Sequence, residues 1–185
     1  MPLFPTLDEV LYLWETSSTP LQQTMEMTSP VSSFSSFIRP LSKLKNLYIY
    51  FIDDMESVPE IGLQKLSSLQ QLSIRGCGRL KSLPLPAQGM HSLQKLYISN
   101  CRELKLLSES ESQGMIPYLP YLQLLIINYC SEELSGRTRG WGKESEEVWP
   151  NIKYIPVIVI DGDYIQKEGR YVKGEGWAFF PFLEY

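Results

Sequence analysis

The chain has 185 residues, 43% of them hydrophobic and 21% charged, which is the composition of an ordinary globular protein of one domain. Seventeen Lys and Arg against 21 Asp and Glu give a net charge of −4, which argues against a nucleic-acid-binding protein, because such proteins usually carry a basic patch. The sequence has no apolar run near the roughly 20 residues of a membrane span, and its start, "MPLFPTLDEV", lacks the pattern of a signal peptide.

Residues 1–40 are predicted to hold a degenerate first repeat and a loop rich in Ser, Thr and Pro. In "FPTLDEVLYLW" (4–14), four residues match the spacing of the repeats that follow: Phe4, Leu7, Val10 and Tyr12. The stretch 16–36 has only weak periodicity, so it is either a loop or a further degenerate repeat.

A pattern of leucines then occurs four times, in "LSKLKNLYIYFI" (41–52), "LSSLQQLSIRGC" (66–77), "MHSLQKLYISNC" (90–101) and "LPYLQLLIINYC" (119–130). Its anchor leucines lie 25, 24 and 29 residues apart, and an isoleucine follows each by two: Leu47, Leu72, Leu96, Leu125 and Ile49, Ile74, Ile98, Ile127. Self-similarity at this period is typical of leucine-rich repeats. The predicted fold is therefore an α/β leucine-rich-repeat solenoid, a curved parallel β-sheet with a mostly irregular convex side.

The spacing has a physical reason in such a fold. Strand side chains alternate, so Leu72 and Ile74 point into the coil while Ser73 faces outward. Cys77 turns inward at the corner, and Leu80 and Leu83 return along the far side. One repeat cannot bury its own apolar face, so the copies stack and cover one another.

The repeats and a C-terminal capping segment are expected to fill residues 41–165. "SESESQG" (108–114) is predicted to bulge from the convex or side face, and 131–150 to form a loop. The β-branched run in 151–166 is a predicted strand that covers the last repeat. Residues 166–185 form an aromatic tail that either packs as a cap or is poorly ordered.

Three cysteines, Cys77, Cys101 and Cys130, share one phase of the repeat, so a disulfide or a metal site has to be weighed against packed, reduced thiols. The ligand spacings of zinc sites are missing and His91 is the only histidine. We therefore expect reduced thiols and no cofactor or metal. The sequence also has no glycosylation sequon, which favours an intracellular protein.

Carboxylates cluster at Asp53–Asp54, at Glu144–Glu147 and at Asp161 with Asp163, and could in principle serve acid–base catalysis. Carboxylates on polar loops are more often simply solvated. "GWGK" (140–143) lacks the spacing of a phosphate-binding loop, and "DGD" (161–163) lacks the further ligands of a calcium loop. A catalytic triad would have to use His91, near which no nucleophile is marked. No enzyme is predicted.

The repeats resemble the C-terminal leucine-rich repeats of plant intracellular nucleotide-binding leucine-rich-repeat disease resistance proteins of the coiled-coil type. The phrase "L-x-x-L-x-I-x-x-C-x-x-L-x-x-L-P" of that family is matched by Leu69, Leu72, Ile74, Cys77, Leu80, Leu83 and Pro84. The end of the family's repeats is matched in order by Cys130, Leu134, Arg137, Gly140, Glu144, Trp149, Pro150, Ile152, Ile155 and Pro156. The resemblance covers roughly residues 1–165.

This resemblance implies a protein-binding module that recognises pathogen effectors or restrains the receptor in its inactive state. Its partners would be an effector or other domains of the receptor, with no nucleic acid and no membrane, and its compartment the cytoplasm, with the nucleus as a second one. The chain lacks the phosphate loop, coiled coil and MHD-type motif of that family, so we expect the tail end of such a receptor. The alternative is an intracellular repeat adaptor that recruits substrates to a ubiquitin ligase.

The candidate binding surface is the concave face of the sheet, where Tyr, Phe and Arg supply the side chains that dominate protein interfaces. The predicted residues are Tyr48, Tyr50, Phe51, Ser73, Arg75, Tyr97, Ser99, Asn100, Asn128 and Tyr129. In the alternative reading these tyrosines only pack on one another across strands. Self-association through an uncapped N-terminal end, where Leu3, Phe4, Leu7 and Val10 would lie partly bare, is a further expectation.

Overall fold

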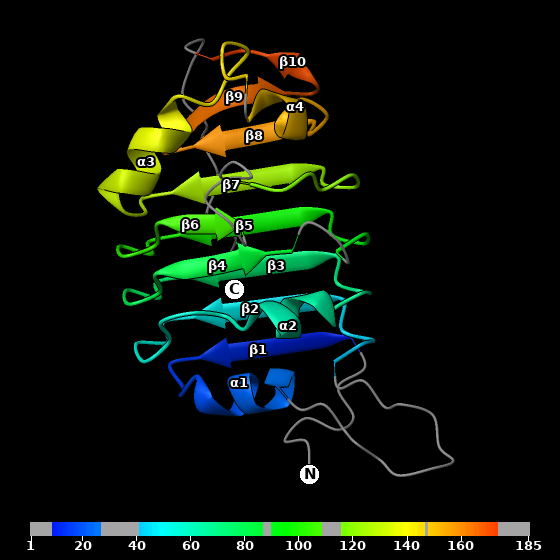
Figure 1. Ribbon diagram of the computed structural model, residues 1–185, viewed down its shortest axis with the longest axis vertical. Helices are drawn as coiled ribbons and strands as arrows, with labels where there is room; N and C mark the ends of the chain where they lie inside the picture. The colour runs from blue at the N-terminus through cyan, green and yellow to red at the C-terminus, as the bar shows by residue number, and fades with distance from the viewer. Residues whose placement is uncertain (1–8, 27–40, 87–89, 109–115, 147, 174–185) are drawn as a thin grey trace.

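A computed structural model describes residues 9–26, 41–86, 90–108, 116–146 and 148–173. It is a mixed α/β structure with one mostly parallel sheet of eight strands in the order β1-β2-β3-β5-β7-β8-β9-β10 (Figure 1). The strands are β1 (Val10–Trp14), β2 (Asn46–Tyr50), β3 (Gln71–Arg75), β5 (Lys95–Ser99), β7 (Leu124–Asn128), β8 (Val157–Ile160), β9 (Asp163–Lys167) and β10 (Arg170–Tyr171).

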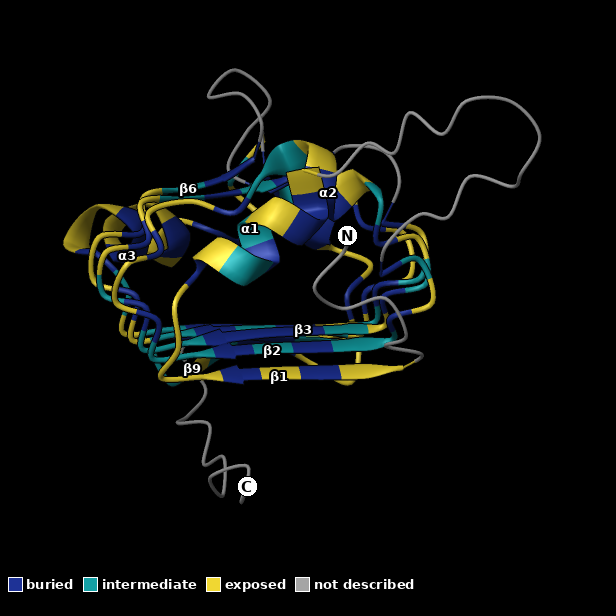
Figure 2. Ribbon diagram, turned by 90° about the horizontal axis from the view of Figure 1, so that it is seen from below, coloured by how far each residue is buried: buried dark blue, intermediate teal, exposed yellow. Residues whose placement is uncertain are grey.

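A second layer lies across the core from this sheet. It holds the parallel pair β4 (Ser82–Leu85) and β6 (Leu106–Ser108), with helices α1 (Thr19–Glu26) and α2 (Glu60–Gln64) beside it (Figure 2). Helix α3 (Glu132–Arg139) follows β7 on the side where the parallel strands end, and α4 (Trp149–Ile152) precedes β8. No helix within the described segments is both long and apolar enough to cross a membrane.

The core lies between the two layers and is built from the repeated leucines and isoleucines. Leu47 pairs in register with Leu72, Leu72 with Leu96 and Leu96 with Leu125, and the isoleucines two residues on pair in the same way. All of these side chains are buried. The predicted parallel strands and their inward phase are therefore confirmed from β2 to β7.

The spacing of three residues before β2, β3, β5, β7 and β8 reflects one repeated turn. The Leu69 amide donates to the Leu66 carbonyl at 3.1 Å, and the corresponding turns are Leu41–Leu44, Met90–Leu93, Leu119–Leu122 and Ile152–Ile155. A similar turn follows the corner, where the Leu80 amide donates to the Cys77 carbonyl. Each turn brings its two apolar side chains back into the core. The apolar residues are therefore three apart in the turns and two apart in the strands, which explains the mixed spacing of the sequence.

The corner at the end of each parallel strand is a residue with positive φ. These residues are Glu15, Phe51, Gly76, Asn100, Tyr129 and Asp161, with φ between 45° and 67°. The Phe51 amide donates to the Arg75 carbonyl at 2.8 Å, and the Gly76 amide to the Ser99 carbonyl at 2.9 Å. The Glu15 and Asn100 amides donate to the Tyr50 and Asn128 carbonyls in the same way, so these four corners each add one interstrand hydrogen bond beyond the end of the strand.

The phase predicted for the first repeat is wrong. Register pairing joins Leu11 to Leu47 and Leu13 to Ile49, so Leu11 and Leu13 are buried while Val10 and Tyr12 are exposed. The run from Val10 to Trp14 is apolar at every position, so its alternation does not reveal which side faces the core. Pairing with β2 decides it. The predicted positions Leu3, Phe4 and Leu7 lie outside the described residues.

Helix α1 occupies part of the stretch predicted as a loop or degenerate repeat. Leu21 and Met25 are buried in the same cluster as Leu11 and Leu13, so they cover described core at the β1 end of the stack. The start of α1 is tied to the next turn of the chain by Asp54. Its carboxylate accepts from the Ser18 amide and from the Ser17 hydroxyl, both at 2.8 Å, and these bonds lower its pKa.

Helix α3 also replaces a predicted loop. Ser131 caps it, since the Ser131 hydroxyl accepts from the Leu134 amide at 3.1 Å. Glu132 and Glu133 lie in its first turn and Arg137 and Arg139 in its last, as the helix dipole favours. Leu134 and Thr138 turn one face into the core, so a mostly polar sequence forms a helix.

The C-terminal end matches the predicted capping strand and extends it. β8 continues the parallel sheet next to β7, and β9 then pairs antiparallel with β8. The Asp161 carboxylate accepts from the Tyr129 amide at 2.9 Å, in the place that a strand-end carbonyl fills for the earlier corners. Residues 166–173 of the predicted tail belong to β9, β10 and the turns beside them; residues 174–185, like 109–115, lie outside the described part.

All three cysteines are free thiols at equivalent places after their strands. The Cys101 thiol donates to the Ser99 carbonyl at 3.4 Å, and the Cys130 thiol to the Asn128 carbonyl at 3.6 Å. Burial raises the pKa of each thiol, that of Cys130 to about 11. The thiolate form is therefore scarce at neutral pH.

We predict opposite effects for two Gly→Ala substitutions. Gly76→Ala should lower the free energy of unfolding by about 1–2 kcal/mol, because Gly76 has φ +67° and the new Cβ would lie 2.4 Å from the Phe51 ring. Gly136→Ala is the matched control within α3, with open space around it, and should raise stability by about 0.5–1 kcal/mol. Urea unfolding measures both, and equal stability of Gly76→Ala and wild type would contradict the corner assignment.

The cysteines should react slowly with a thiol reagent such as dithionitrobenzoate at pH 8 in the folded protein. Only the thiolate reacts, and burial both raises the thiol pKa and blocks access. In denaturant all three should react at the rate of a free cysteine. Fast reaction of Cys77 and Cys101 without denaturant would show that these corners are open.

Candidate protein-interaction face

The outer face of the main sheet is defined by the strand side chains that point away from the core. On β1, β2, β3, β5, β7 and β8 these are Val10, Tyr12, Trp14, Asn46, Tyr48, Tyr50, Gln71, Ser73, Arg75, Lys95, Tyr97, Ser99, Leu124, Ile126, Asn128, Val157 and Val159. In Figure 2 this face lies opposite the layer of helices, so none of the described helices covers it.

Aromatic rings gather on the β1–β2 half of the outer face. The rings of Tyr12 and Tyr48 stack with centroids 4.2 Å apart, and Tyr48 meets Tyr50 edge-on at 6.0 Å. Trp14 contacts Tyr50 at 5.8 Å and Phe51 at 5.3 Å. These five residues, Tyr12, Trp14, Tyr48, Tyr50 and Phe51, form the aromatic cluster.

The aromatic cluster has an exposed rim and a covered floor. Tyr12 and Trp14 are 63% and 52% exposed, whereas Tyr48 and Tyr50 are half-buried. The Tyr50 hydroxyl and the Ser73 hydroxyl lie 3.1 Å apart and share a hydrogen bond. Large exposed aromatic groups on a rigid sheet are the side chains that contribute most to protein–protein affinity.

The structure places most of the sequence-predicted binding residues on this face, but some of their side chains are not exposed to solvent. Ser73 points outward as predicted and is yet only 4% exposed. The Asn128 side chain accepts from the Gly162 amide at 3.1 Å, so it holds the turn before β9. Arg75, Tyr97 and Ser99 are half-buried along β3 and β5.

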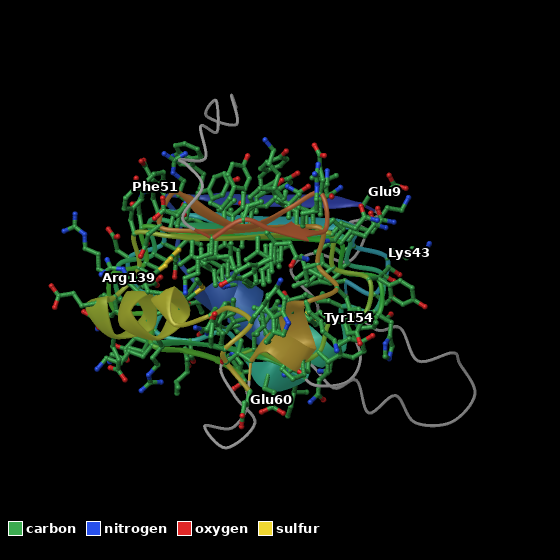
Figure 3. The ribbon with its side chains drawn as sticks, turned by 90° about the horizontal axis from the view of Figure 1, so that it is seen from above. Glu9, Lys43, Phe51, Glu60, Arg139 and Tyr154 are labelled. Carbon is green, nitrogen blue, oxygen red and sulfur yellow. The ribbon has the colours of Figure 1, made fainter. Side chains whose placement is uncertain are left out.

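Three predicted residues lie at the corners. Phe51, Asn100 and Tyr129 follow β2, β5 and β7 directly, and Figure 3 shows Phe51 at one end of the strands with Glu9 at the other. Asn100 and Tyr129 are exposed, and the half-buried Phe51 ring lies over Gly76. These side chains form the exit edge of the outer face.

Sequence reasoning missed Tyr12 and Trp14, the most exposed members of the aromatic cluster. The signal was present, because both residues stand on the strand of the first repeat. The wrong phase of that repeat directed Tyr12 into the core. Pairing of Tyr12 with Tyr48 and of Trp14 with Tyr50 corrects it.

The middle of the β7–β8 half of the outer face is apolar and buried. Ile126 and Val159 are neighbours in register and are both buried, although they point away from the core. Among the described strand positions of this face, the exposed aromatic side chains are therefore Tyr12 and Trp14 on β1, and Tyr129 adds a further exposed ring at the exit edge after β7.

The catalytic alternatives find no assembled site in the described residues. His91 lines an open groove of about 440 Å³ with Gln70, Gln94, Tyr121 and Tyr154, and no carboxylate lines it. Asp54 and Asp161 bind backbone amides instead. Arg139 approaches the second oxygen of Asp161 only to 3.8 Å, and that oxygen is buried without a hydrogen bond. No group of three or more metal-binding side chains occurs in the described part of the chain.

Comparison with known proteins yields no relative. No protein-family model, no curated protein and no solved structure matches this chain.

We predict that Tyr48 ionises with a pKa of about 12, against 10.0 for a free tyrosine, because burial and the neighbouring Tyr12 hydroxyl disfavour its phenolate. A raised pKa in the folded state stabilises the fold below pH 10, and this contribution is lost as the pH rises through 12. Absorbance titration of wild type and Tyr48→Phe, with circular dichroism to verify folding, isolates this group. A difference curve with its midpoint near pH 10 would contradict the packing of Tyr48 under Tyr12.

Proposed function

We propose that this chain is a non-catalytic protein-binding module, built as a leucine-rich-repeat solenoid, that binds its partner through the outer face of the main sheet. In keeping with the sequence resemblance, we propose the C-terminal repeats of a plant intracellular immune receptor. The partner would be a pathogen effector or another domain of that receptor, in the cytoplasm.

Three regularities support the solenoid. The anchor leucines stack in register, the same turn precedes β2, β3, β5, β7 and β8, and a left-handed corner follows each of these strands. A stack of like turns buries a continuous core and leaves one long sheet face for binding. The period of the sequence pattern is that of leucine-rich repeats.

The observation that carries the binding function is the aromatic cluster with its exposed rim. Tyr12 and Trp14 keep more than half of their surface exposed although they pack against neighbouring rings. Rings already held by their neighbours lose little side-chain entropy on binding, which favours affinity. Tyr12 packs on Tyr48 and Trp14 on Tyr50 across β1 and β2, and this packing holds the rings in place for a partner.

A substrate-recruiting adaptor of a ubiquitin ligase would use the same face. The identity of the bound partner therefore distinguishes such an adaptor from a module of an immune receptor. An adaptor should co-purify with ligase subunits. A receptor fragment should instead capture an effector or a domain of its receptor.

The test is quantitative affinity purification from healthy and infected plant tissue with three baits: wild type, Tyr12→Ser with Trp14→Ser, and Tyr118→Ser with Tyr121→Ser. The last pair is the matched control, since Tyr118 and Tyr121 are also exposed tyrosines but lie before β7, away from the outer face. A true partner should be retained by wild type and control and fall about tenfold or more with the Tyr12 and Trp14 variant.

Equal capture of the same proteins by all three baits would mean that the outer face is not the binding surface. Circular dichroism of each bait must match wild type, so that loss of capture reports the surface and not unfolding.

A further inference from the structure

The charges on the outer face differ from those of the whole chain. Its strand positions, as defined above for the described strands β1 to β8, include two cations, Arg75 and Lys95, and no carboxylate. The chain as a whole carries a net charge of −4. Neither cation forms an ion pair with a described carboxylate. Other cations away from the centre of this face do pair with glutamates: Lys45, Arg79, Lys81 and Lys105.

The two cations have a defined separation. Lys95 begins β5 and pairs in register with Gln71, whereas Arg75 ends β3 and pairs with Ser99. Their backbones are therefore one strand apart, about 4.8 Å, and four residues apart along the strand, about 13 Å. Tyr97 on β5 lies midway between them along the strands, and Tyr48 and Tyr50 lie on β2, which pairs with β3.

We propose that the outer face binds an extended segment of a partner protein that carries two carboxylates four residues apart, with an apolar or aromatic side chain midway between them. In an extended chain the residues i, i+2 and i+4 point to one side, and i to i+4 spans about 13 Å. The carboxylates meet Lys95 and Arg75, and the middle side chain meets the tyrosines. The inference rests on the proposed function and names its partner chemistry.

Charge pattern favours such a segment over a polyanion. A nucleic acid presents a phosphate at every nucleotide and needs a continuous basic track, whereas this face offers two separate cations on a protein of negative net charge. Two separate carboxylates can each pair with one of the two cations, and the apolar or aromatic side chain between them contacts the tyrosines.

The test uses a fluorescein-labelled peptide, Ser-Glu-Thr-Phe-Thr-Glu-Ser, titrated with the full chain and followed by fluorescence anisotropy. The comparison peptides replace both Glu by Gln, both Glu by Lys, or Phe by Ser. The Glu peptide should bind at least about fivefold more tightly than the Gln peptide at low salt, and this ratio should shrink with added salt. Replacing Phe by Ser should also weaken binding.

Protein variants locate the contact. Arg75→Glu and Lys95→Glu should each weaken binding of the Glu peptide by about fivefold or more, and the double variant should prefer the Lys peptide. Arg102→Glu is the matched control, since Arg102 is exposed on the turn after Cys101 and off the outer face; it should change binding less than twofold. Circular dichroism verifies that each variant is folded.

The outcomes separate this inference from the proposed function. Equal binding of the Glu and Gln peptides, with loss of both in the Tyr12→Ser and Trp14→Ser variant, would overturn the charge readout and leave the outer face as a binding surface. Absence of binding by every peptide would overturn the inference of a linear acidic segment. Capture of a partner through Tyr12 and Trp14 in the purification experiment would still support the proposed function.

Discussion

Each parallel strand of the main sheet ends in a left-handed corner, and the rest of the structure depends on that corner. A residue with positive φ turns the chain toward the second layer. From β1 to β5 its amide also donates to the strand-end carbonyl of the next strand, as from Phe51 to Arg75 and from Gly76 to Ser99. A non-glycine residue in this conformation is less favourable by roughly 1–2 kcal/mol, which the hydrogen bond and the packed core behind it must offset. The same corner directs the Phe51 and Tyr129 side chains to the exit edge of the outer face. Core and candidate surface are thus fixed by one backbone feature.

Much of the sheet could be predicted because two periods overlap in the sequence. Leucines three apart mark the turns, and Leu with Ile two apart marks the strand, so the inward phase of β2, β3, β5 and β7 followed without knowledge of their neighbours. The first strand could not be assigned this way, because Val10, Leu11, Tyr12 and Leu13 are all apolar. Only the pairing with β2 distinguishes the two phases. Helix α3 was missed for a different reason: its residues are mostly polar and include Gly136, which is unfavourable within a helix. The Ser131 cap and the opposite charges at its ends were the local signals that indicated it.

The candidate site was predictable as a row of positions but not as a surface. Alternation along the strands predicts which residues point outward, and the structure has four of them in that orientation: Tyr48, Tyr50, Arg75 and Tyr97. It does not give what covers them. Ser73 is buried although it points outward, and Asn128 is held by Gly162, 34 residues further along the chain. Such contacts arise only when distant turns stack, so their effect on exposure cannot be deduced from one repeat at a time.

The antiparallel strand β9 has a consequence for how a protein of this kind can change in length. From β2 to β7 every strand pairs in parallel and in the same register with its neighbours, so duplication or deletion of a whole turn leaves the strand pairing on both sides intact. β8 is different, because its far edge is occupied by β9 and its corner residue Asp161 binds the preceding corner through a carboxylate rather than a carbonyl. A strand added after β8 could not pair with β8, because β9 already occupies that edge. The corner there also lacks the carbonyl acceptor that the earlier corners use. Gain and loss of modules in evolution should therefore be confined to the stack before β8, and with them the width of the face available to a partner.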